Sequence, residues 1–143
     1  MNNGAGSLLD EEEFVRWREE ADRAAEGARV QAQAGLHNWA CFLAEQGAQL
    51  AIKALLHGLG RGAWGHDVVR LGQEVEEAKL AVPPGVAGAL RRLSRHYIPA
   101  RYPDAHPSGP PSLHYAAEDS EDSISDMQLV LAFVDESWTS LHD

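Results

Sequence analysis

Apolar residues recur at intervals of three and four positions along almost the whole chain, and this spacing constrains the fold more than any other feature. In the N-terminal part the spaced residues are Phe14, Trp17, Ala21, Ala24, Ala25, Ala28 and Ala32. This spacing puts them on one face of an α-helix, whereas a half-buried strand would alternate apolar and polar residues. No segment shows that alternation, so the sequence predicts an all-α protein.

Start and stop signals divide the pattern into five helices. We expect one from the capping-box spacing Ser7–Asp10 to Gly35, one over 36–57, a short one over 66–79, one from Pro83–Pro84 to Tyr97, and one over 117–140. The predicted architecture is an antiparallel up-and-down helical bundle of four long helices plus one short helix.

A long loop with five prolines, 99–115, separates the last two predicted helices. A loop of that length is usually functional or disordered. The 143 residues suffice for one domain with its own core. We therefore predict a single domain over 1–143, with its core from about 8 to 140.

The chain is acidic, with a net charge of -10, but the charge is unevenly spread. The segment 86–102 carries four arginines and no acidic residue. An acidic whole opposes non-specific binding of nucleic acid, whereas a local basic segment can hold an anion. These arginines can equally neutralise acidic neighbouring helices, and the sequence leaves both interpretations open.

Other features indicate a cytoplasmic protein that does not enter a membrane. Cys41 is the only cysteine, and the apolar runs are six residues at most. The N-terminal segment lacks the pattern of a signal peptide. The histidines lack the spacing of metal ligands, so we predict neither a metal site nor a cofactor.

Three stretches now fall into order: "WACFLAEQGAQLAIKALL", "GHDVVRL" and "LSRHYIPARYPDAHP". Together they resemble the HEPN domain family, from about Phe14 to Trp138, with "RYPD" as the most specific element. The resemblance implies a helical bundle that homodimerises, with a cleft lined by the end of the third long helix. It also implies toxin–antitoxin pairing with a minimal nucleotidyltransferase (MNT) partner, as in many members of the family.

Several branches of that family are metal-independent endoribonucleases with an arginine followed by a histidine after four to six residues. Arg101 and His106 fit this spacing. The histidine would act as general acid and base, while the arginine would hold the scissile phosphate. The same spacing also occurs for Arg61 with His66 and for Arg91 with His96. Pro103 breaks the helix between Arg101 and His106, which argues against a site on continuous helix.

We therefore expect a dimer cleft that binds a nucleotide or an RNA phosphate. The candidate binding residues are Arg101, Tyr102, Asp104, Arg95, His66 and Lys53. The alternatives are an endoribonuclease that uses Arg101 and His106, and a non-catalytic helical interaction module.

Four of the residues singled out also have plain structural explanations. Asp104 can pin Arg101 across the proline turn, and His66 can cap a helix. Lys53 can extend over apolar neighbours, with its ammonium group in water. Trp64, in the glycine-rich stretch "GLGRGAWG", can stack on a base or pack on the bundle as a lid.

Overall fold

The computed structural model describes residues 9–143, and it confirms the all-α prediction. Its helices are α2 (Glu11–Gln33), α3 (His37–Gly58), α4 (Val68–Glu77), α5 (Pro84–Ser94) and α6 (Ala117–Ser140), with single 3-10 turns η1 (Pro103–Ala105) and η2 (Pro111–His114). No strand occurs among these residues.

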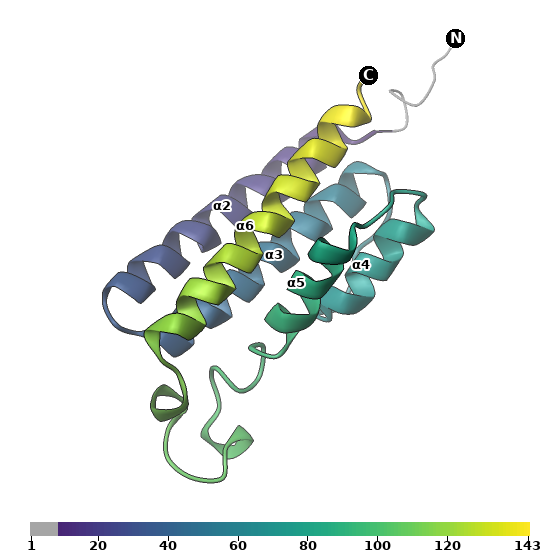
Figure 1. Ribbon diagram of the computed structural model, residues 1–143. Coiled ribbons are helices and arrows are strands. Elements are labelled where there is room, and N and C mark those ends of the chain that lie inside the picture. The colour runs from purple at the N-terminus through teal and green to yellow at the C-terminus, as the bar shows by residue number, and fades with distance from the viewer. Residues whose placement is uncertain (1–8) are drawn as a thin grey trace.

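The long helices α2, α3 and α6 lie side by side, with α4 and α5 beside α3 and α6 (Figure 1). Along the chain α2, α3, α5 and α6 alternate in direction, as expected for an up-and-down bundle, and the short α4 is inserted between α3 and α5 (Figure 1). Phe14 at the start of α2 stacks on Trp138 at the end of α6, with ring centres 4.1 Å apart. The two ends of the helical region therefore meet at one end of the bundle.

Turn and cap residues set most of the boundaries. Asp10 caps α2, since its side chain accepts a hydrogen bond from the backbone of Glu13. The predicted capping box began at Ser7, which lies outside the described residues. Gly35 follows α2 with φ of +80°, a conformation that favours glycine. Asp67 caps α4, so the capping alternative for His66 is wrong.

The helix that begins at Pro84 is shorter than the sequence suggested. It ends at Ser94 and not at Tyr97, and its 11 residues are close to the 10 of α4. The bundle thus has three long helices and two short ones. Residues 95–101 continue as turns, because Pro99 has no N–H to donate to the Arg95 carbonyl oxygen and its ring would crowd that group in a helix.

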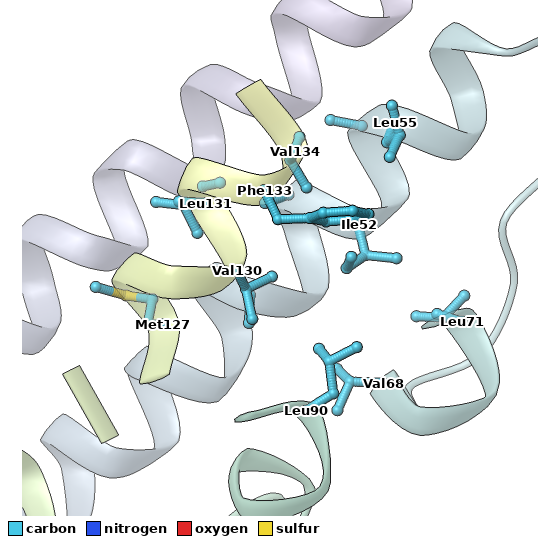
Figure 2. Close-up of a cluster of buried hydrophobic side chains, with 14 of the residues drawn as sticks. Ile52, Leu55, Val68, Leu71, Leu90, Met127, Val130, Leu131, Phe133 and Val134 are labelled. Carbon is cyan, nitrogen blue, oxygen red and sulfur yellow. The ribbon is translucent and has the colours of Figure 1, made fainter. Parts of the chain in front are cut away.

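Helix α3 is the central element. Fifteen of its 22 residues are buried. It packs against α2, and both helices bury small residues: a Cβ at Gly47 would lie 3.6 Å from the Ala21 carbonyl oxygen, and other small residues buried on the two helices include Ala25, Ala28, Ala44, Ala48 and Ala51. Figure 2 shows side chains of α3, α4, α5 and α6 turned toward a common interior, Ile52, Leu71, Leu90 and Val130 among them. None of the helices in the described range has the length and apolarity that crossing a membrane would need.

Close packing around Gly58, where α3 ends, predicts how a substitution there changes stability. A methyl group on Gly58 would lie 2.5 Å from the Trp138 ring and 3.0 Å from Phe14. Because those two rings are stacked, neither can move freely, so we expect Gly58→Ala to reduce the free energy of unfolding by about 1–3 kcal/mol. Urea denaturation measures this.

Gly47→Ala is the matched control on the same helix. A methyl group at Gly47 meets Met127 Sδ at 2.9 Å, which is the far end of a flexible side chain. The gain in helix propensity should offset much of that contact. Equal losses of stability in the two variants would contradict the packing described here.

Candidate functional site

A surface groove of about 450 Å³ lies where the start of α4 meets the turns that follow α5. Its lining residues are His66, Asp67, Ser94, Tyr97, Ile98 and Pro99. All but the first two come from the arginine-containing segment 86–102. The groove therefore joins two of the three stretches that sequence analysis singled out.

Arg101 lies next to this groove and is clamped by aromatic rings. Its guanidinium carbon is 4.5 Å from the ring centres of Phe42 and Tyr97 and 4.9 Å from that of Tyr102. Its Nε donates to the Tyr97 carbonyl oxygen at 2.8 Å, and Nη1 lies 3.5 Å from the Tyr102 hydroxyl. Such contacts fix the plane of the guanidinium and leave most of its donors unused.

The ion pairs of the described residues do not include Arg101. Asp104 is exposed in η1. The proposed Arg101–Asp104 pin is therefore not present. Arg18 and Arg92, in contrast, each make a two-pronged contact with an aspartate.

The backbone that carries Arg101 is attached to α3. Ala100 is fully buried, and its carbonyl oxygen accepts a hydrogen bond from the buried Asn38 side chain at 3.0 Å. This bond satisfies a backbone acceptor in a turn where helix geometry has ended. The position of Arg101 thus depends on α3 as well as on the chain before it.

A buried polar network on α3 runs toward the groove. Glu45 is completely buried and accepts hydrogen bonds from the amides of Gln46 at 2.8 Å and Gln49 at 3.0 Å. The Gln49 amide oxygen pairs with His66 Nδ1 at 3.0 Å, and the His66 ring stacks on Tyr97. Since an amide oxygen only accepts, His66 Nδ1 carries the proton. Its Nε2 has no hydrogen-bond partner among the described residues.

The charges around this network interact. Burial raises the pKa of Glu45, and the amides of Gln46 and Gln49, followed by Arg101 and Lys53, oppose that rise. Burial also lowers the pKa of Lys53, whose side chain is largely buried with its Nζ 5.9 Å from the Trp17 ring. Lys53 therefore points toward α2 and does not line the groove.

The remaining predicted binding residues lie at the surface. Tyr102 is 46% exposed and covers one face of the Arg101 guanidinium. Arg95 is exposed beside His96 and, like Asp104, does not line the groove. The structure brings together Arg101, Tyr102 and His66 and leaves Arg95, Asp104 and Lys53 outside the arrangement.

His106, the proposed catalytic partner of Arg101, is engaged elsewhere. Its Nε2 lies 2.7 Å from the Pro99 carbonyl oxygen, and its ring stacks on His114 at 4.2 Å. No contact between His106 and Arg101 is found among the described residues. In the other spaced pairs, His96 Nδ1 bonds to the Tyr115 hydroxyl at 3.0 Å, and Arg61 is exposed.

Sequence reasoning missed Phe42, Glu45 and Tyr97, which build the site. Phe42, Glu45 and Gln49 are three and four positions apart, which places them on one face of α3. A lone acid within a run of small and apolar residues was the signal that marked this face. Among the described residues, no group of three or more His, Cys, Asp or Glu side chains could hold a metal ion.

Comparisons with known proteins show the family and the fold. The model of the HEPN domain matches residues 14–137. The fold is similar to TT1696 from Thermus thermophilus, with 38% identity, a TM-score of 0.83 and coverage of 86% of this chain and 96% of that one. It is also similar to ST0689, an archaeal HEPN homologue, with 30% identity, a TM-score of 0.72 and coverage of 87% and 96%.

A third similar structure is an HEPN domain protein (tm0613) from Thermotoga maritima, with 25% identity, a TM-score of 0.70 and coverage of 87% of this chain and 98% of that one. A comparison with curated proteins found no match. With most of its length matched by the family model, and with helical relatives at up to 38% identity, this chain belongs to the HEPN domain family.

Proposed function

We propose that the groove beside Arg101 binds the phosphate of a nucleotide, either free or within RNA. The observation that supports this most is the Arg101 guanidinium itself, which three aromatic rings hold in place while no carboxylate neutralises it among the described residues. Five of the ten arginines form no ion pair among the described residues, and Arg101 is the one of them whose guanidinium lies against aromatic rings. A fixed guanidinium loses little freedom when it binds an anion.

The neighbouring groups suit the same ligand. His66 lines the groove and offers Nε2, and Tyr102 presents an exposed phenol ring beside the guanidinium. A guanidinium forks onto two phosphate oxygens, and aromatic rings stack on bases or sugars. These roles need neither metal nor proton transfer, so the proposed function is binding.

Arg101→Ala should weaken the binding of ATP or GTP about ten- to a hundredfold, because charge-assisted hydrogen bonds contribute about 1.5–3 kcal/mol. Arg101→Lys should recover only part of this, since lysine keeps the charge but loses the planar fork. The measurement is the rise in melting temperature with nucleotide concentration, repeated with a short oligoribonucleotide.

Arg23→Ala is the matched control, because it removes one positive charge from an exposed site on α2. It should leave binding unchanged. If wild-type protein binds no nucleotide and no RNA, the interaction-module alternative is supported instead. RNA cleavage in EDTA that disappears in His106→Ala would support the endoribonuclease alternative.

Binding should also depend on pH through Glu45. Burial raises the pKa of this carboxyl, so it becomes charged only above the usual range for glutamate. Once charged, Glu45 attracts Arg101 and repels a bound phosphate, so affinity should fall as pH rises through that pKa. Glu45→Gln should remove this fall. The comparison is made at each pH, so that the titration of the ligand cancels; parallel pH profiles would contradict the coupling.

The homodimer expected from the sequence is proposed to form along one face of α3. Five residues of this face are partly exposed, uncharged and spaced as a stripe: Trp39, Phe42, Leu43, Gln46 and Leu50. α6 carries seven acidic residues and no Lys or Arg, and α2 carries seven acidic residues against four arginines, so a face of either helix would tend to repel its own copy. A two-fold interface must complement itself, which this neutral stripe can do. Phe42 belongs to both the stripe and the clamp, so Arg101 would lie at the edge of the dimer.

Trp39→Asp should convert the dimer to a monomer, because the new carboxylate would be buried opposite a second copy without a partner. Light scattering coupled to size-exclusion chromatography measures the mass. Leu129→Asp on α6 is the control, since Leu129 is 44% exposed and Trp39 is 43% exposed. If both variants keep the wild-type mass, the stripe is not the interface.

An MNT-type nucleotidyltransferase partner in a toxin–antitoxin setting belongs to the proposal as well. It is supported by membership of the HEPN domain family and by no contact in this chain. Co-purification with a neighbouring gene product of that type would test it.

A further inference from the structure

Trp64 differs from the other three tryptophans in its surroundings. It is 83% exposed, whereas Trp138 is buried. Trp17, Trp39 and Trp138 each pack against another aromatic ring, and Trp64 has no aromatic partner among the described residues. The lid interpretation, in which Trp64 packs on the bundle, is therefore wrong. Single exposed apolar residues are common, so the exposure of Trp64 indicates a function only if Trp64 also lies near a site.

The position of Trp64 is fixed from both sides. Ala63, immediately before it, is 4% exposed and belongs to the core. His66, two residues after it, accepts a hydrogen bond from the Gln49 amide through its carbonyl oxygen at 3.3 Å. The chain between these anchors holds only Trp64 and Gly65, and Gly65 has φ of +84°.

This tether keeps the indole close to the groove. His66 and Asp67 line the groove, and two residues of chain span at most about 7 Å. The indole nitrogen folds back over Gly62, where an added Cβ would lie 3.0 Å away. Glycine at position 62 thus leaves room for the ring to lie along its own loop. The aromatic face of Trp64 is therefore held in solvent two residues along the chain from His66, which lines the groove that Arg101 borders.

We propose that Trp64 is the base-recognition element of this site, stacking on the nucleobase of the ligand whose phosphate Arg101 holds. The inference rests on the proposed function and extends it, because it assigns recognition of the nucleobase to Trp64 and so predicts that a bare phosphate or polyphosphate binds more weakly. Stacking of a base on an aromatic side chain contributes affinity with little sequence preference, since every base has a flat π-face. Trp64 would thus favour nucleosides as a class.

The test compares ligands with and without a base. ATP and inorganic tripolyphosphate carry similar charge, and a short oligoribonucleotide and its abasic counterpart form the matching pair for RNA. Trp64→Ala should weaken binding of ATP and of the oligoribonucleotide roughly five- to a hundredfold, by analogy with other aromatic–base contacts. Binding of tripolyphosphate and of the abasic strand should stay unchanged. Trp64→Phe should restore most of the loss.

Stacking also has an optical signature. Ligand with a base should quench part of the tryptophan fluorescence of the wild-type protein, and this part should vanish in Trp64→Ala. Leu129→Ala, which removes another exposed apolar side chain, should bind all four ligands as the wild type does. Because Trp64 is exposed, its replacement should leave the melting temperature of the free protein unchanged.

The outcomes separate the two proposals. If the wild type binds ATP or RNA and Trp64→Ala binds them equally well, the role of Trp64 is overturned while the phosphate site stands. If Trp64→Ala weakens tripolyphosphate and ATP alike, Trp64 supports the loop and does not recognise the base. If the wild type binds none of the four ligands, the proposed function fails and the inference fails with it.

Discussion

The close contact between α2 and α3 is the constraint on which the rest of the structure depends. Both helices bury several alanines, and Gly47 of α3 lies close to the backbone of Ala21 on α2. This contact holds α3 at the centre, where α4, α5 and α6 pack on its other sides. One stripe of α3 stays partly open, and Phe42 lies on it. The site is therefore assembled on the most deeply packed helix of the bundle.

Arg18, Arg92 and Arg101 show two ways in which this acidic protein holds a guanidinium. Arg18 and Arg92 are held by aspartates from α6, which ties the helices together. Arg101 is held by π-faces, which attract a guanidinium without cancelling its charge. The rings thus orient the Arg101 guanidinium without neutralising its positive charge. The carboxyl group that interacts with Arg101 is Glu45, whose burial favours its neutral form.

Much of the fold could be predicted from the sequence, because its helices end at residues with strong local preferences. Gly35 and Pro84 mark their boundaries through backbone geometry alone. The end of α5 was misplaced, since the influence of Pro99 on the preceding turns extended further than the residue just before it. His66 was the candidate for the cap of α4, but the side chain of the next residue, Asp67, accepts the hydrogen bonds there.

The candidate site was predicted only in part, for a different reason. Arg101 stood out by local charge, and Tyr102 by its position beside it. The aromatic clamp and the path from Glu45 to His66 depend on α3 meeting a turn far away in the sequence, which no local pattern records. His106 fitted a spacing that is satisfied three times in the chain, so spacing could not reveal that its ring nitrogen bonds to Pro99.

The Asn38 side chain has a consequence for how the protein tolerates change. By donating a hydrogen bond to the carbonyl oxygen of Ala100, it attaches the backbone just before Arg101 to α3. Residues 107–110 are exposed beyond that attachment point, before the buried Pro111 and η2 return the chain to α3. Natural insertions or deletions there can reshape the rim and alter which molecules gain access, while the cation stays where it is. Ligand preference can therefore change in evolution without loss of the hydrogen bond between Asn38 and Ala100.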